Sequence, residues 1–174
     1  AGVAALPAIN RFYGTSGYGG SIHVFDGASN GLVTTLPISY CGGQLTADPT
    51  TGLVYVMSQC GPGNDPVHVL GGTTNTLVAG PLSSGGVANF PLVNTNTGRL
   101  YAVRSGGTRV FGPAPGFAFL VDLPGSCRAV DAVLNRLYFQ SGNTVQVRDG
   151  GSHALITSIL NVTSGGGWDA DSVQ

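Results

Sequence analysis

Apolar and polar residues alternate over short segments, and one such segment recurs four times along the chain. It is centred on tyrosine and occupies residues 11–14, 53–56, 99–102 and 136–139. Alternation over four to eight residues is typical of a half-buried β-strand. The tyrosines at positions 13, 55, 101 and 138 lie 42, 46 and 37 residues apart. A recurrence of this length predicts a protein built from repeated β units.

Each tyrosine segment belongs to a unit of four predicted strands. A short strand rich in small residues comes first, at 3–6, 44–47, 87–90 and 128–131. A second alternating strand follows the tyrosine segment, at 21–26, 66–71, 108–112 and 144–149. The last strand occupies 32–37, 77–82, 118–124 and 155–160. Three of these last strands carry a proline near their end, which is typical of an edge strand because proline cannot donate to the ladder.

The turns before the tyrosine segments predict hairpins. They occupy 8–10, 48–52, 94–98 and 134–135 and contain Asn, Asp, Pro and Gly, the residues that favour chain reversal. Four-stranded antiparallel units with no intervening helix predict an all-β fold, a β-propeller. Its blades should span 1–40, 41–84, 85–125 and 126–164, and residues 167–174 align with the inner strand of a fifth unit. We therefore expect one propeller domain or a propeller segment, with one surplus strand that completes a larger ring or a sheet in a neighbouring copy.

Several of these segments resemble the YVTN family of β-propellers. The units of that family combine a Tyr-Val strand, a Val-x-Val-Ile-Asp-like strand, an outer strand ending near Ile-Pro and an Asp-Pro-x-x-Gly turn. The matching stretches are residues 53–56, 22–26, 34–37 and 48–52, whereas the turn at 113–116 departs from the pattern. The resemblance implies a propeller fold and, because many members look like surface or extracellular proteins, a similar location.

Composition narrows the classes of partner. Hydrophobic residues make up 42% of the chain, charged residues 9%, and the net charge is −1. All seven basic residues are arginines scattered along the sequence, so no basic stripe is available for nucleic acid. No apolar run is long enough to cross a bilayer. The chain starts with Ala and shows no signal-peptide pattern, which fits a processed protein, an excised domain or part of a longer chain.

Two cysteines are placed to pair across a predicted hairpin. The register that sets Thr50 opposite Thr51 also sets Cys41 opposite Cys60, although the neighbouring glycines can shift it. A disulfide there would imply an oxidising compartment, and the alternative is two unrelated thiols. Cys127 is expected to be a buried small residue or an intermolecular link. Asn161 begins an Asn-Val-Thr glycan acceptor sequence.

Candidate chemistry is sparse. His23 and His68 occupy equivalent strand positions, which favours packing or surface roles, and His153 lies in an outer turn. Catalytic motifs and phosphate-binding loops are missing from the sequence, so we expect no enzyme activity and no cofactor. The metal candidates are acidic residues on or near inner strands, namely Asp131, Asp169 and Asp171. We expect the four repeated tyrosines to stack between blades.

Three functions remain. The first is a non-enzymatic extracellular or cell-surface structural module that binds a protein or itself through blade or edge-strand contacts. The second is a carbohydrate-binding propeller that stacks sugars on Tyr18, Tyr40 and Trp168. The third is a propeller hydrolase or lactonase, which would need a polar metal cluster at a channel mouth.

Overall fold

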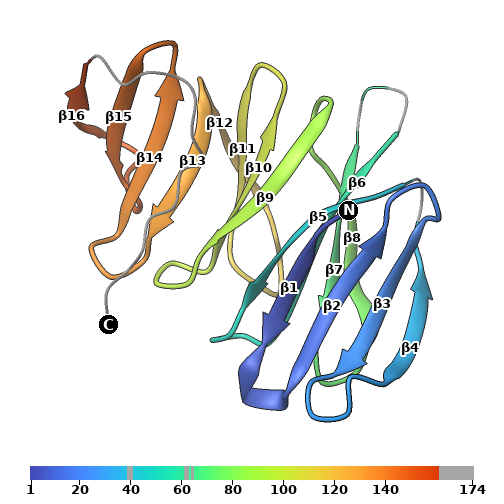
Figure 1. The fold of residues 1–174 in the computed structure, drawn as a ribbon. Helices are drawn as coiled ribbons and strands as arrows, with labels where there is room; N and C mark the ends of the chain where they lie inside the picture. The colour runs from blue at the N-terminus through green and yellow to red at the C-terminus, as the bar shows by residue number, and fades with distance from the viewer. Residues whose placement is uncertain (39–40, 61–62, 64, 161–174) are drawn as a thin grey trace. The chain divides into compact units, whose positions relative to one another are not determined.

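The computed structural model describes residues 1–38, 41–60, 63 and 65–160. These residues form sixteen strands and one 3-10 helix, η1 (Pro7–Ile9). The strands make four separate four-stranded antiparallel sheets, each built from strands consecutive in sequence (Figure 1). This confirms the all-β class and the four-stranded antiparallel blades, and each sheet lies inside one of the four expected ranges. Residues 167–174, expected to form the surplus strand, lie outside the described residues.

The strands are numbered in chain order from the inner to the outer strand of each blade. Blade one contains β1 (Val3–Leu6), β2 (Arg11–Ser16), β3 (Ser21–Asp26) and β4 (Leu32–Pro37). Blade two contains β5 (Cys41–Asp48), β6 (Leu53–Gln59), β7 (Pro66–Gly71) and β8 (Thr76–Ser83). Blade three contains β9 (Ala88–Asn94), β10 (Arg99–Arg104), β11 (Gly107–Phe111) and β12 (Phe119–Leu123). Blade four contains β13 (Ser126–Asp131), β14 (Arg136–Ser141), β15 (Thr144–Asp149) and β16 (Leu155–Ile159).

One backbone position is left-handed in all four blades. It immediately precedes the tyrosine strand and is occupied by Asn10, Gly52, Gly98 and Asn135, with φ of 51°, 69°, 68° and 52°. Glycine adopts this region freely and asparagine tolerates it better than most residues. The sequence therefore places Asn or Gly where each chain reversal requires them, and this fixes the register of the first hairpin of each blade.

The outer strand of each blade is also irregular at one equivalent place. The register shifts between Val24 and Phe25, Val69 and Leu70, Val110 and Phe111, and Val147 and Arg148. Such bulges bend the strand and increase its twist. The outer strands thus repeat a shape that hydrophobic patterning alone does not specify.

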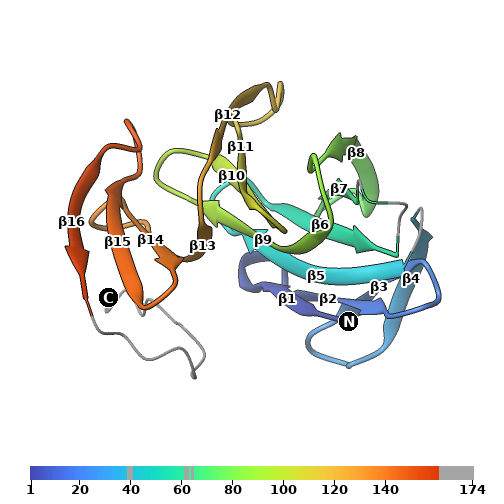
Figure 2. The same cartoon turned by 90° about the horizontal axis from the view of Figure 1, so that it is seen from above.

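The chain divides into two compact units, Ala1–Pro91 and Leu92–Gln174. In the first unit, β1 and β5 run as neighbouring inner strands of blades one and two (Figure 2). Between these blades lies an apolar core. Blade one contributes Leu6, Tyr13, Ile22 and Val24, and blade two contributes Leu45, Val54, Val56 and Leu70. Across the described residues, no helix has the length and apolar character needed to cross a membrane.

Candidate functional site

Neighbouring blades are joined by a repeated tyrosine hydrogen bond. The Tyr13 hydroxyl of blade one donates to the Gly72 carbonyl of blade two at 3.1 Å. The Tyr101 hydroxyl of blade three donates to the Gly150 carbonyl of blade four at 3.3 Å. Burial raises the pKa of Tyr101 to about 12, so this hydroxyl remains a proton donor at physiological pH. Both acceptor glycines directly follow the third strand of their blade.

An arginine reinforces the contact between blades three and four. Arg99 lies two residues before Tyr101, and its Nη1 donates to the carbonyl of Gly150 at 2.9 Å and to that of Gly151. The same atom lies 3.4 Å from Nε2 of His153, whose ring meets the Tyr101 ring edge-on. Arg99 and Tyr101 of blade three therefore both donate hydrogen bonds to the turn at Gly150 in blade four.

That acceptor turn is held in shape by an aspartate. Asp149 Oδ1 accepts hydrogen bonds from the backbone N–H of Gly151 and of Ser152 and from the Ser152 hydroxyl, at 2.7–3.0 Å. The Gly150 N–H donates to the Asn135 carbonyl at 2.8 Å. A Cβ on Gly150 would lie 2.2 Å from Asn135 Oδ1, so the close approach requires glycine. The Gly150 carbonyl is thereby presented toward blade three.

Blade one contains the same turn. Asp26 Oδ1 accepts hydrogen bonds from the backbone N–H of Ala28 and of Ser29 and from the Ser29 hydroxyl, at 2.9–3.1 Å. The Gly27 N–H donates to the Asn10 carbonyl at 2.9 Å. Within the part of the chain that the structure describes, no side-chain hydroxyl donates to the Gly27 carbonyl. The Gly27 carbonyl differs in this from the Gly150 carbonyl, which accepts the Tyr101 hydroxyl.

Blade four contains an arginine and a tyrosine at the positions that Arg99 and Tyr101 occupy in blade three. Arg136-Leu137-Tyr138 repeats Arg99-Leu100-Tyr101. Tyr13, Tyr55 and Tyr101 are at most 1% exposed, whereas Tyr138 is only half-buried. No described residue pairs with the Tyr138 hydroxyl. The hydroxyls of Tyr13 and Tyr101 thus bond the neighbouring blade, in line with the expectation that the tyrosines lie between blades, whereas the Tyr138 hydroxyl has no partner among the described residues.

The face of blade one that points away from blade two is apolar and partly exposed among the described residues. It includes Val3 and Ala5 of β1 and the rings of Phe12 and Phe25, which stack with centroids 4.8 Å apart. By strand register, Val3, Phe12 and Phe25 correspond to Leu45, Val54 and Leu70 of blade two. These three residues of blade two are 0–9% exposed because blade one covers them, whereas Val3 is 73% exposed. The same strand positions therefore form a core in one blade and a surface in the other.

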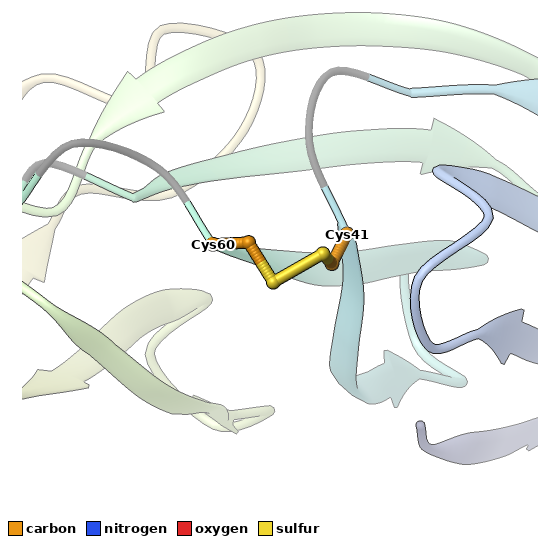
Figure 3. Close-up of a disulfide and its surroundings, with 2 residues drawn as sticks. All are labelled: Cys41 and Cys60. Carbon is orange, nitrogen blue, oxygen red and sulfur yellow. A yellow bond between two sulfur atoms is a disulfide. The ribbon is translucent and has the colours of Figure 1, made fainter.

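A disulfide joins Cys41 at the start of β5 to Cys60 just beyond β6, with a Cα–Cα distance of 5.6 Å (Figure 3). This confirms the expected pairing, but the register differs from the simple hairpin. A shift between Gly42 and Leu45 places Cys41 opposite Gln59, and Cys60 adopts φ of 67°. The disulfide indicates an oxidising environment.

A small pocket lies beside this disulfide. It has a volume of about 190 Å³ and is lined by Ala1, Gly17, Tyr18, Cys41, Gly42, Gln59 and Cys60. Tyr18 is 95% exposed, so its ring is open to solvent although it contributes to the lining of the pocket. Tyr40 and Trp168, the other aromatic residues expected to stack on sugars, lie outside the described residues, as does the glycan acceptor Asn161.

The acidic metal candidates are not brought together by the described residues. Asp131 ends β13, and its Oδ1 accepts the Leu134 N–H at 2.9 Å, as a turn residue does. Asp169 and Asp171 lie outside the described residues. Over the part of the chain described, no group of three or more metal-binding side chains is present.

Cys127 and the histidines take structural positions. Cys127 is free and fully buried, and burial raises its pKa to about 12, which confirms the buried alternative. Its backbone N–H donates to the Thr108 hydroxyl of blade three at 3.0 Å. His23 Nδ1 pairs with the Thr35 hydroxyl at 3.0 Å. His68 is 3% exposed, and burial lowers its pKa.

Sequence inspection missed the arginine and the acceptor turn of the blade contact. The signal was present as two repeated motifs, Arg-Leu-Tyr at 99–101 and 136–138 and Asp-Gly-x-Ser at 26–29 and 149–152. Their pairing was invisible because donor and acceptor lie about fifty residues apart, in different blades.

Four-stranded antiparallel blades that pack face against face define a protein of the β-propeller class. Comparison with known proteins agrees with this class. A chain of the Kuenenia stuttgartiensis hydrazine synthase superposes with a TM-score of 0.75 over 91% of the present chain, at 11% sequence identity. The present chain spans about half, 48%, of that chain's length. No family model and no curated protein matches the sequence. The likeness to the synthase shows the fold alone.

Proposed function

We propose that the protein is a non-enzymatic structural and interaction module of an extracellular or cell-surface assembly, and that it associates with itself through its blades. The observation that carries the proposal is the partly exposed apolar face that the described residues of blade one present, where Val3, Ala5, Phe12 and Phe25 lie. Contiguous exposed apolar surface marks interaction sites in soluble proteins. Equivalent positions in blade two are buried against another blade, which supports a protein partner of similar shape.

The disulfide and the surface composition support the location. The Cys41–Cys60 bridge requires an oxidising compartment. The chain contains no lysine and only 9% charged residues, so its surface relies on Ser, Thr, Asn and Gly for solubility. Resemblance of the repeats to the YVTN family favours the extracellular or surface alternative within that compartment.

Size-exclusion chromatography with light scattering tests the proposal. The weight-average mass of the oxidised full chain should rise above that of the monomer as protein concentration increases from micromolar to hundreds of micromolar. A mass that stays at 17.5 kDa over this range would contradict self-association.

Carbohydrate binding is a second candidate because the exposed Tyr18 is one of the residues that line the pocket at the disulfide. The pocket lining includes an exposed tyrosine ring and the Gln59 amide, a stacking surface and polar groups, which is the combination that sugar sites use. On a glycan array, Tyr18→Ala should abolish any signal, and Tyr18→Phe should keep most of it because the ring remains. An array without signal for the wild-type chain would remove this candidate.

A further inference from the structure

The turn between β3 and β4 contains the one Asn-Gly dipeptide of the sequence, Asn30-Gly31. We propose that Asn30 is a site of spontaneous deamidation, at which the backbone nitrogen of Gly31 attacks the side-chain amide carbon of Asn30 and ammonia leaves. The reaction needs only the turn itself and water. It therefore goes beyond the proposed function and does not depend on it.

The residue that follows an asparagine decides how easily this attack occurs. A side chain on that residue crowds its backbone nitrogen, whereas glycine has none. Among the described residues, four asparagines have left-handed backbone with φ of 51–55°, namely Asn10, Asn30, Asn75 and Asn135. Arginine or threonine follows the other three. The four sites share a backbone conformation and differ in the residue that would attack.

The backbone nitrogen of Gly31 also lies outside the strands. β4 begins at Leu32, and the Gly31 N–H donates to the Ser29 hydroxyl at 3.2 Å. The residues that follow the other three asparagines each open a strand and pair with a neighbouring strand, namely Arg11, Thr76 and Arg136. A peptide unit in a ladder cannot rotate toward the preceding side chain without breaking backbone pairing. The fold therefore restrains three of the sites more strongly than Asn30.

Each step of the reaction balances with water as the co-reactant. Hydroxide removes the Gly31 N–H proton, the nitrogen bonds to Cγ of Asn30, and the Cγ–Nδ2 bond breaks to release ammonia. The product is a cyclic succinimide. Water then opens either carbonyl of this ring, which gives aspartate or the isoaspartyl form. The rate should rise with pH because the attacking nitrogen must lose its proton.

The isoaspartyl form should loosen the outer hairpin of blade one. The Gly31 carbonyl accepts the Asp26 N–H at 2.9 Å. Asp26 Oδ1 in turn accepts three hydrogen bonds from Ala28 and Ser29. The isoaspartyl form adds a methylene to the main chain between Ser29 and Gly31, and it adds a carboxylate to a turn that already holds that of Asp26. We expect the bond between the Asp26 N–H and the Gly31 carbonyl to be lost.

Peptide mass spectrometry of the oxidised full chain, kept folded at pH 8, tests the modification site. Asn30 should convert to aspartate and isoaspartate while Asn10, Asn75 and Asn135 stay intact over the same period. An isoaspartate methyltransferase assay should detect the second product. Conversion at Asn30 no faster than at the other three would overturn the proposal. An Asn30 that converts in urea but stays intact in the folded chain would overturn it too, because the fold would then protect the turn.

Gly31→Ala is the matched variant. Among the described residues, a Cβ at Gly31 would meet only the Ser29 hydroxyl oxygen, at 3.2 Å, and the φ of Gly31 is not positive. Blade four has Ala154 at the equivalent place, where its carbonyl accepts the Asp149 N–H at 3.0 Å. The variant should therefore melt like the wild type and deamidate severalfold more slowly. An unchanged rate would contradict attack by the Gly31 nitrogen.

Asn30→Asp separates the effects of the two products. Aspartate tolerates left-handed backbone, so hydrogen exchange of the Asp26 N–H should be as slow in this variant as in the wild type. The isoaspartyl form, purified from aged protein by ion exchange, should exchange this hydrogen severalfold faster. Equal exchange in all three proteins would overturn the proposed loosening of the hairpin.

Discussion

Single residues set the turns of this protein. Asn or Gly precedes every tyrosine strand in left-handed backbone, and buried Asp48 accepts hydrogen bonds from Thr50 and Thr51 to close the β5–β6 turn. These roles follow from residue type, because Asn and Gly tolerate positive φ and Asp accepts local backbone hydrogen bonds. The turn residues were therefore predictable from the sequence.

The substitution Gly52→Ala measures how much free energy of unfolding is lost when a residue with a Cβ takes a left-handed backbone conformation. A Cβ at Gly52 would meet nothing within 4 Å, and φ is 69°, so steric clash plays no part. We expect a loss of about 1 kcal/mol in the free energy of unfolding, measured by denaturant titration. Gly52→Asn should lose less because Asn tolerates this region. Equal losses for the two variants would contradict this account.

His68 should make stability depend on pH. Its imidazole is buried, its Nε2 has no hydrogen-bond partner among the described residues, and burial lowers its pKa below the usual 6.5. The unfolded chain therefore binds a proton more readily than the folded chain below that pH. Stability should be complete above pH 6.5 and decrease as pH falls toward the lowered pKa.

Replacing His68 tests this dependence. The melting temperature of the wild type should fall by a few degrees between pH 7.5 and pH 5, and His68→Leu should show a smaller fall. A residual fall is expected from His153, whose pKa is also lowered, by burial and then by Arg99 and Arg148. Thermal melts of both proteins at the two pH values measure this difference, and equal falls would contradict a contribution from His68.

At the scale of strands, the hydrophobic pattern predicts where each strand lies but not where its register shifts. All sixteen strands of the described residues follow from alternation and turn residues, but the bulges in the outer strands and in β5 do not. The β5 bulge moves Cys41 from the position facing Cys60 to the one facing Gln59. The disulfide still forms, because Cys60, just after β6, adopts a left-handed backbone that turns the chain toward Cys41.

Removing the disulfide should destabilise the hairpin of blade two. The bridge closes a sequence separation of 19 residues, for which loop entropy predicts about 3 kcal/mol. Cys41→Ser with Cys60→Ser should lower the free energy of unfolding by about that amount in urea. Reduction of the wild type should give the same loss, and Cys127→Ala serves as a thiol control. Identical midpoints for oxidised and reduced protein would contradict a structural role.

At the scale of the whole molecule, blade contacts decide what is core and what is surface. Tyr101 and Tyr138 share one motif, yet Tyr101 is 0% exposed and hydrogen bonded, whereas Tyr138 is half-buried and its hydroxyl has no partner among the described residues. The contact with the Gly150 turn of blade four, rather than the local sequence, accounts for the burial of Tyr101.

A pair of equivalent substitutions measures that difference. Tyr101→Phe removes the buried bond to Gly150 and should cost about 1 kcal/mol of unfolding free energy or more. Tyr138→Phe should change the stability of the dilute chain by less than about 0.5 kcal/mol. Chemical denaturation at low micromolar concentration measures both. Equal losses would show that Tyr138 is already paired within the chain.

The sequence by itself determined the repeat, the strands, their order within each blade and the residues of the turns. These features depend on interactions between residues close along the chain, so periodicity and turn chemistry report them. Only the tertiary structure decided which side chains meet between blades, that His68 is buried while His23 is half-buried, and that Tyr101 is buried while Tyr138 is half-buried. Those outcomes depend on contacts between residues far apart in sequence, where an identical motif can be buried in one blade and exposed in another.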